Sequence, residues 1–102
     1  MSHQSIVRRY EKMQHPGQVK LISVGWHPAK PAGAIVEGDM LVYNYGSKAR
    51  VVKVEGIQGQ FITFWTECPP DRWGNPTACF RSRRRIDSLV GFDARASRKE
   101  AV

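Results

Sequence analysis

Short runs of apolar residues, each closed by turn-forming residues, restrict how this chain can fold more than any other feature. The apolar residues are mainly β-branched, with ten Val and six Ile against three Leu. Branched and aromatic side chains suit a pleated sheet, whereas leucine-poor sequences form poor helix bundles. A chain of 102 residues has room for one hydrophobic core. The sequence therefore predicts a single domain that is mainly β.

Hydrophobic periodicity and turn residues divide the chain into expected elements. The spacing of Ile6, Tyr10 and Met13 is typical of one helical face and predicts a short helix over residues 5–13. The proline-bearing residues 27–33 are expected to form an extended connector. Strands are expected at residues 19–26, 40–45, 49–55, 61–67 and 77–84, and within residues 86–92 after a tight turn.

Five or six strands this short make a sheet that must roll up to protect its edges and enclose a core. SH3-like and OB-like barrels both do so, and the tight successive hairpins between residues 40 and 84 favour the meander of the SH3-like class. We therefore expect a five- to six-stranded antiparallel SH3-like barrel over residues 19–92. A short N-terminal helix, within an extension of residues 1–18, would precede it. Residues 93–102 would form a flexible, frayed and basic C-terminal tail.

A resemblance to a known family supports this fold class. The segment Gly38–Tyr43, followed by Gly46 and Ala49–Val54, has a Gly-Asp turn, a strand, a glycine turn and a second strand. It resembles the opening hairpin of SH3-like barrels, in particular those of KOW type. The KOW pattern usually carries a second turn glycine, and this sequence has Lys48 or Ala49 near that position. The resemblance implies a small barrel of a class that commonly binds RNA or a partner of the transcription or translation machinery.

Branched and aromatic residues of the expected strands supply the candidates for the core. Successive residues of a strand point to opposite faces, so not all of these candidates can face inward. The candidates are Phe61, Phe64, Ile62, Val52, Val54, Leu41 and Phe80.

Positive charge is concentrated in one expected strand of a chain whose formal net charge is +7. In an extended strand, Arg81, Arg83 and Arg85 point to one face with about 6–7 Å between neighbours. That separation approximates the spacing of phosphates along a nucleic-acid strand, and the planar guanidinium group suits phosphate. No acidic residue lies between Asp71 and Asp87. The alternative interpretation is an edge strand that its charge keeps soluble.

The first functional hypothesis is a non-enzymatic nucleic-acid-binding module that contacts DNA or RNA largely through phosphates. Trp73 lies in a loop rich in Pro, Gly and Asn, where it would stack on a base or fold back as a lid over the barrel end. The residues expected to bind nucleic acid are Arg81, Arg83, Arg84, Arg85, Lys48, Arg50, Lys53, Arg72 and Trp73.

The second hypothesis is a protein-interaction module, an accessory or inhibitory protein of phage or plasmid type that binds a host protein. Tyr43 and Tyr45 share one face of an expected strand, and SH3-like domains line peptide-binding grooves with such aromatic residues. The arginines would steer the module toward an acidic partner. The residues expected to bind a protein partner are Trp73, Tyr43, Tyr45 and Trp65.

Motifs for catalysis and metal binding are missing from the sequence. It contains no glycine-rich phosphate loop, no H-E-x-x-H and no G-x-S-x-G, so we expect no enzyme. Cys68 and Cys79 have no zinc-like spacing, and the three histidines are scattered, so we expect neither a metal nor another cofactor. The cysteines are expected to be reduced thiols, with a disulfide as the alternative. No apolar run reaches about 18 residues, so we expect a cytoplasmic protein that does not enter membranes.

Overall fold

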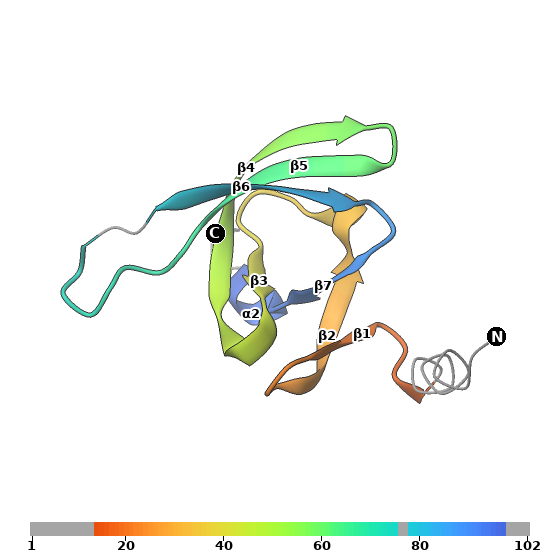
Figure 1. Ribbon diagram of the computed structural model, residues 1–102, viewed down its shortest axis with the longest axis horizontal. Helices are drawn as coiled ribbons and strands as arrows, with labels where there is room; N and C mark the ends of the chain where they lie inside the picture. Colours follow the sequence, from red (N-terminus) through yellow and green to blue (C-terminus); the bar gives the residue numbers. More distant parts are fainter. Residues whose placement is uncertain (1–13, 76–77, 98–102) are drawn as a thin grey trace.

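The structure is a computed structural model that describes residues 14–75 and 78–97, and these residues form one antiparallel sheet of seven strands (Figure 1). Neighbouring strands follow the order β1-β2-β7-β3-β4-β5-β6, which confirms that the chain is mainly β. The strands are β1 (Gln18–Leu21), β2 (Gly25–Pro31), β3 (Met40–Val42), β4 (Lys48–Gln58), β5 (Phe61–Glu67), β6 (Cys79–Arg85) and β7 (Leu89–Phe92), and the helical turns are η1 (Ala32–Ala34), η2 (Asn44–Gly46) and α2 (Ala94–Ser97).

The sheet is open, because β1 and β6 lie at its two ends and no ladder among the described residues pairs them. The expectation of a closed barrel with five or six strands is therefore wrong in both strand number and closure. The difference arises within residues 18–31, where an expected strand and connector are instead β1 and β2. A turn at Ser23, whose φ is 65°, separates these two strands and lets them extend the sheet beyond β7.

β2 contains Pro28 and Pro31, so the prediction of a connector at residues 27–33 is wrong. Proline has no N–H to donate, and this normally excludes it from a strand that is paired on both sides. β2 avoids the conflict because it changes partner along its length. Residues Gly25–Pro28 pair with β1, and residues Ala29–Pro31 pair with β7. Each proline thus lies where β2 has a ladder on one side only.

β4 is the longest strand and belongs to both halves of the sheet. Residues 48–50 pair with β3, and residues 50–58 pair with β5. Two register shifts between Val51 and Gly56 interrupt the second ladder, and such irregularities bend a strand and increase its twist. In Figure 1, β4 rises beside β3 and then turns into the hairpin with β5. The bend sets β4, β5 and β6 as a layer across β3 and β7.

The hydrophobic core lies between this layer and the strands below it. Leu41, Ile62 and Phe64 are each 1% exposed, which confirms them as core residues, and Val54 packs against the cluster they form. Ala32 of η1 and Ile35 directly after η1 also belong to the core, a contribution that the sequence pattern did not predict. The buried cluster consists of Ala32, Ile35, Leu41, Val51, Ile62, Phe64 and Val90.

Three residues expected in the core lie outside it. Val52 is 39% exposed and Phe80 is 56% exposed, and Phe61 points to the side of β5 opposite the buried Ile62. The physical reason is the two-residue period of a strand, which gives neighbouring residues opposite faces. Because Val51 is buried, the residue after it points to solvent. Hydrophobicity alone could not decide which residue of each pair is inside.

The sequence predicts a helix only near the N-terminus, and the structure describes one near the C-terminus, α2. The helix expected over residues 5–13 lies outside the described residues. Near the other end, Asp93 begins the short helix α2, because its Oδ1 accepts the N–H of Arg95 at 3.1 Å. The Asp93 N–H donates to the carbonyl oxygen of Met40 at 2.9 Å, which fastens this turn to β3. Among the described residues, no helix has the length and apolar character needed to span a membrane.

One buried carboxylate joins three segments of the fold. Asp39 is 4% exposed and forms an ion pair with Lys30 of β2. Its Oδ2 also accepts the N–H of Val36 at 2.9 Å, and its carbonyl oxygen accepts the N–H of Val51 at 2.8 Å. The Lys30 ammonium lies over the Phe92 ring, 4.3 Å from its centroid. Asp39 therefore ties β2 and the loop before β3 to β4.

We expect Asp39→Asn to lower the free energy of unfolding by about 3 kcal/mol, because it leaves the largely buried Lys30 ammonium without its counter-charge. Urea denaturation followed by circular dichroism measures the loss. The control is Asp87→Asn, which removes an ion pair whose side chains are 56% and 73% exposed. That exposed pair should contribute less than about 1 kcal/mol. Equal losses in the two variants would contradict a structural role for Asp39.

Candidate nucleic-acid interface

The layer formed by β4, β5 and β6 has one face on the core and one face away from it. Along β5, Ile62, Phe64 and Thr66 are buried, so the residues between them point outward. The antiparallel register places the alternate residues of β6 beside these outward residues. We call this surface the outer face, and its residues are Lys53, Glu55, Phe61, Thr63, Trp65, Glu67, Arg81, Arg83 and Arg85.

Arginines and aromatic rings alternate across the outer face. Arg81 is paired in register with Trp65, and Arg85 is paired with Phe61. Arg83 lies between these two arginines along β6, and its guanidinium group stacks over the Phe61 ring, 4.0 Å from the centroid. All three arginines are exposed. The outer face therefore presents cationic groups beside flat rings, an arrangement suited to phosphates and bases.

Glu55 organises one end of the outer face. Its Oε2 accepts the Trp65 Nε1–H and the Arg81 Nε–H, each at 2.7 Å, and its Oε1 accepts a second guanidinium N–H of Arg81 at 3.2 Å. These bonds from Arg81, and next that from Trp65, hold the pKa of the Glu55 carboxyl below its ordinary value. The same contact raises the pKa of Arg81. The clamp orients the indole ring and one arginine together.

The charge of the outer face is more balanced than the sequence predicts. The outer face carries four positive residues, Lys53 and the three arginines, and two negative residues, Glu55 and Glu67. At its edge, Asp87 contacts Arg85 at 3.4 Å. Acidic residues are absent near the arginines in the sequence but not in space, because Glu55 contacts Arg81 although it lies 26 positions away in the chain. Arg83 has an aromatic partner and, like the exposed Lys53, no ion pair among the described residues, so both cations are available to a phosphate.

Sequence reasoning missed Phe61 as a functional candidate and assigned Trp65 only to protein binding. The structure brings both rings to the face that carries Arg81, Arg83 and Arg85. A usable signal was present, because Phe61 and Trp65 have the same parity along β5, opposite to Phe64. Choosing which parity faces outward needed the packing of the core.

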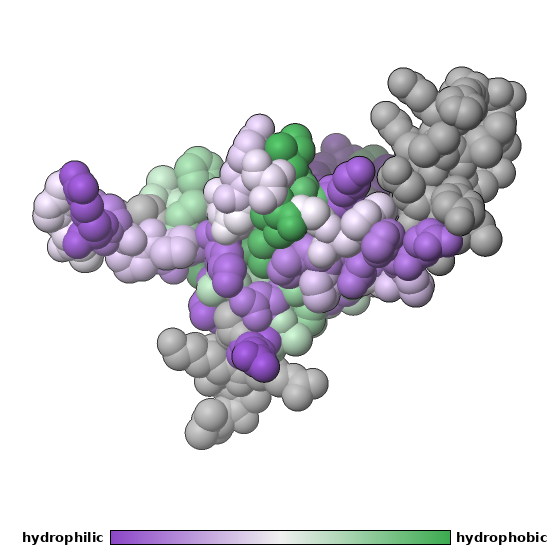
Figure 2. All heavy atoms as spheres, turned by 90° about the horizontal axis from the view of Figure 1, so that it is seen from below, coloured by the Kyte–Doolittle hydropathy of each residue, from purple (hydrophilic) through white to green (hydrophobic). Residues whose placement is uncertain are grey.

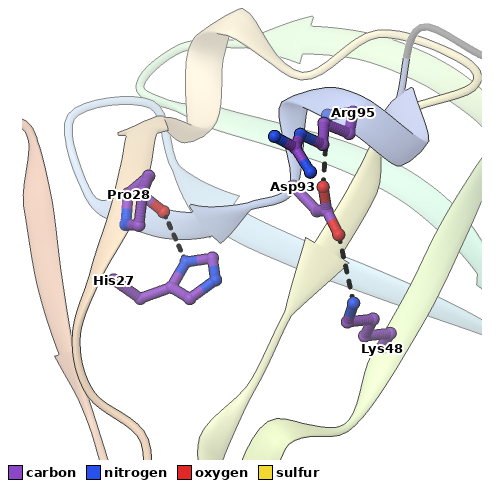
Figure 3. Close-up of polar contacts among 5 residues, drawn as sticks. All are labelled: His27, Pro28, Lys48, Asp93 and Arg95. Atoms are coloured by element: carbon purple, nitrogen blue, oxygen red, sulfur yellow. Dashed lines mark hydrogen bonds and ion pairs between the residues drawn. The ribbon is translucent and has the colours of Figure 1, made fainter.

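Lys48 lies far from the outer face, at the end of β4 that pairs with β3. Its Nζ donates to Asp93 Oδ2 at 3.0 Å, and Figure 3 shows Asp93 between Lys48 and the backbone of Arg95. Arg50 is half-buried, and its guanidinium group donates to the carbonyl oxygen of Gly38 at 2.9 Å. Arg50 pairs in register with Glu67 at one end of the outer face, but its guanidinium group is bonded to Gly38, so Lys53 is the exposed cation that β4 contributes to this face.

Arg84 points to the side of β6 opposite Arg83 and Arg85. Its register partner is the buried Ile62, so its side chain starts on the core side of the layer. The four consecutive residues 82–85 therefore divide between two surfaces. Arg83, Arg84 and Arg85 are consecutive in the sequence, but in the strand their side chains point alternately to opposite sides.

Arg72 and Trp73 lie in the long loop between β5 and β6, which projects away from the sheet in Figure 1. Asp71 braces the loop, because its Oδ1 accepts the N–H groups of Trp73 and Asn75, each at 2.9 Å. The backbone bond from Asn75 leads the contacts that hold the pKa of the Asp71 carboxyl below its ordinary value. Trp73 is 71% exposed, with the Arg72 guanidinium 4.3 Å from its ring centroid. The loop presents this pair apart from the outer face.

The four aromatic residues expected to bind a protein partner do not form one surface. The expectation that Tyr43 and Tyr45 share a strand face is wrong, because β3 ends at Val42. Tyr43 packs against the core, whereas Tyr45 has a φ of 65° in η2 and is 72% exposed. The Tyr45 N–H donates to the carbonyl oxygen of Ile22 at 2.7 Å, which places the Tyr45 backbone beside the β1–β2 turn.

Exposed apolar side chains gather near this turn. Ile22 is 55% exposed and Val24 is 39% exposed, and both lie in the turn that Tyr45 contacts. Figure 2, which views the molecule from below, shows the most hydrophobic residues of that side over the β1–β2 turn. Trp65 and Trp73 are on other surfaces, so the aromatic residues occupy separate parts of the molecule.

Cys68 and Cys79 are free thiols. Cys79 pairs in register with Glu67, so Cys68 is one residue away from the position across from it. Adjacent positions point to opposite sides of a strand pair, and the two sulfur atoms are therefore not directed at each other. In residues 14–75 and 78–97, no three His, Cys, Asp or Glu side chains are grouped so that they could hold a metal ion.

Comparison with known protein families, with curated proteins and with solved structures finds no match to this chain.

The Glu55 clamp makes a measurable prediction about titration. In an NMR titration of the full chain, the pKa of the Glu55 carboxyl should lie below its ordinary value and should rise in Arg81→Gln. Because the folded state lowers this pKa, the clamp stabilises the fold above the unfolded pKa, and this contribution is lost as pH falls through the folded pKa. Arg84→Gln, on the other side of the strand, is the control and should leave Glu55 unchanged. A Glu55 pKa unaffected by Arg81→Gln would disprove the clamp.

Proposed function

We propose that this chain is a non-enzymatic nucleic-acid-binding module, and that it binds an unpaired stretch of DNA or RNA on the outer face. The observation that supports the proposal most is the alternation of arginines with Phe61 and Trp65 on one exposed sheet surface. Arginine binds phosphate through a planar fork, and aromatic rings stack on bases of any sequence. Stacking requires bases that are not already paired, which favours a single strand.

The dimensions of the outer face agree with this ligand. Phe61 and Trp65 are four residues apart on β5, which corresponds to about 13 Å along the strand. An extended single strand covers that length with about two nucleotides, so one base can stack on Trp65 while its neighbour lies beside Phe61, whose ring carries the Arg83 guanidinium group. Arg81, Arg83 and Arg85 run alongside at about 6–7 Å intervals, near the repeat of the phosphates.

The proposal assigns Arg83 the first phosphate contact, because its stack on Phe61 holds the guanidinium group without a carboxylate. Arg81 and Arg85 are held by Glu55, Gln60 and Asp87 and contribute by exchanging these exposed partners for phosphate. Exposed ion pairs are weak, so the exchange costs little. Lys53 lies on the same face, beside Trp65. Lys48, Arg72 and Arg84 are excluded from the interface by their positions, and the Arg50 guanidinium group is bonded to Gly38.

The SH3-like class remains our proposal for the strands β3 to β7. Four strands follow one another as an up-and-down meander from β3 to β6, and β7 returns to pair with β3. This arrangement supports the resemblance carried by the Gly38–Val54 hairpin, with β1 and β2 as additions at one edge. The open sheet leaves the KOW-type resemblance as a proposal about the fold only.

Fluorescence anisotropy with labelled single strands of about twelve nucleotides tests the proposed function. We expect binding that weakens steeply between about 50 mM and about 200 mM salt, because phosphate contacts release counterions. Arg83→Gln should weaken binding several-fold and reduce the magnitude of the salt slope by about 0.7, the value for one phosphate contact on a single strand. Trp65→Leu should weaken binding by about 1–3 kcal/mol through lost stacking.

Arg84→Gln is the matched control, since it removes the same charge from the adjacent residue on the opposite side of β6. It should leave the dissociation constant for the oligonucleotide nearly unchanged. The proposal fails if no binding is detected at low salt. It also fails if Arg84→Gln weakens binding as much as Arg83→Gln, because net charge rather than the outer face would then be responsible.

A second candidate function, binding of an acidic protein partner, is favoured by one observation. Trp73 is 71% exposed on a loop that Asp71 braces through three hydrogen bonds, and Arg72 stacks on its ring. An exposed Trp held in place loses little conformational freedom on binding, and tryptophan and arginine are enriched among residues that dominate protein interfaces.

The Trp73→Ala variant separates the two functions. If the loop binds a protein, the variant should lose a partner that wild type captures after nuclease treatment, and its affinity for oligonucleotides should not change. Because Trp73 is exposed, its removal should leave the urea midpoint within the range of a surface substitution. Lost oligonucleotide affinity with intact protein capture would reject this second function.

A further inference from the structure

A cavity of about 320 Å³ opens on the core side of β6, where this edge strand faces β1, β7 and the end of β3. Its volume is near the lower end of the range for small-molecule sites. The cavity lies on the opposite side of β6 from the outer face and shares no lining residue with it. Its residues play no part in the proposed binding of nucleic acid.

Arg84 lines this cavity and is half-buried. Among the described residues, its side chain makes no hydrogen bond and no ion pair, in contrast to Arg81 and Arg85. Partial burial of a guanidinium group without a carboxylate or carbonyl partner is unfavourable. The described residues that line the cavity include no Asp and no Glu. Within residues 14–75 and 78–97, the charge of Arg84 therefore has no carboxylate partner.

Two neutral polar groups lie near Arg84 in the same cavity. Burial raises the pKa of the Tyr43 hydroxyl, and the nearby Arg84 charge acts on it in the opposite direction. Asn44 also lines the cavity, and its Oδ1 is already occupied by the N–H of Ile22 at 2.9 Å. A side-chain hydrogen bond with Thr66 also lowers the pKa of Tyr43, so the Tyr43 oxygen accepts from Thr66 and its O–H remains a donor beside the guanidinium group. A cation and a hydroxyl donor together form a site for an oxyanion.

Much of the remaining cavity wall is apolar, and the exposed Lys20 of β1 also lines the cavity. Leu21 of β1 and Leu89 and Val90 of β7 line it, and Gly91 brings the backbone of β7 close to Leu21. A free, strongly hydrated anion such as inorganic phosphate would lose its water against these side chains without compensation. An anion with an apolar body would instead bury that body against the wall.

From these contacts we infer that the cavity is a binding site for a small organic carboxylate, with the carboxylate on Arg84 and the Tyr43 hydroxyl and the apolar body between β1 and β7. The planar guanidinium fork pairs with a carboxylate through two parallel hydrogen bonds. The site needs no nucleic acid, so it is independent of the function proposed for the outer face.

Benzoate is the probe, and the full chain labelled with ¹⁵N is the sample. Titration should shift the backbone amides of Leu89, Val90 and Gly91 and the Arg84 Nε resonance, and the shifts should saturate. Benzamide has the same shape without the charge. Its dissociation constant, measured from the same shifts, should be at least about tenfold larger, as expected for loss of a charge-assisted pair. Inorganic phosphate should bind more weakly than benzoate.

Arg84→Gln should raise the dissociation constant for benzoate by about tenfold or more, whereas Arg83→Gln should leave it unchanged. Arg84→Lys keeps the charge without the planar fork and should give an intermediate affinity, which keeps the test usable if Arg84→Gln does not fold. The assignment would be overturned if benzoate and benzamide bound with equal affinity, or if phosphate bound more tightly than benzoate. It would also be overturned if Arg84→Lys and Arg84→Gln both kept the wild-type affinity for benzoate. Arg83→Gln affects only the oligonucleotide and Arg84→Gln only benzoate, so the two proposals fail separately.

Discussion

The buried ion pair between Asp39 and Lys30 is the contact on which the arrangement of the sheet depends. Lys30 belongs to the part of β2 that pairs with β7, and the Asp39 backbone is bonded to Val51 of β4. A carboxylate removed from water is stable only with a counter-charge and hydrogen-bond donors. This ion pair therefore holds β2, β4 and β7 in fixed relative positions. β7 passes between β2 and β3, where a Cβ on Gly91 would collide with the carbonyl oxygen of Val42. Charge and close backbone approach together keep the open sheet folded over its core.

The bend in β4 then gives β6 two distinct surroundings. One side of β6 joins the exposed outer face, where Arg83 stacks on Phe61, and the other side faces the cavity that Arg84 lines. Because β6 is an edge strand, its arginines also discourage pairing with another chain. The proposed functions follow from this division, since adjacent residues of one strand meet different ligands.

How far the sequence predicted the structure varied between elements. The expected strand at residues 61–67 coincides with β5, because its alternation is regular and turn residues flank it. β2 was missed, because its prolines argue against a strand unless the strand changes partner midway, which no local pattern reveals. The outer face was predicted in part. The two-residue period of β6 places three arginines on one face. The sequence pattern assigned Phe61 to the core, however, and gave no sign that Glu55 contacts Arg81.

The sequence by itself determined the β character of the chain, the positions of most strands, and the alternation that puts Arg81, Arg83 and Arg85 on one side of β6. These properties depend on backbone preferences and on the two-residue period of a strand, and both act over a few neighbouring residues. The tertiary structure alone decided that the sheet stays open, that Glu55 meets Arg81, and that Arg84 is half-buried with no carboxylate partner in the described part of the chain. These outcomes depend on contacts between residues far apart in the chain, and burial in the folded molecule selects among the pairings that local patterns leave open.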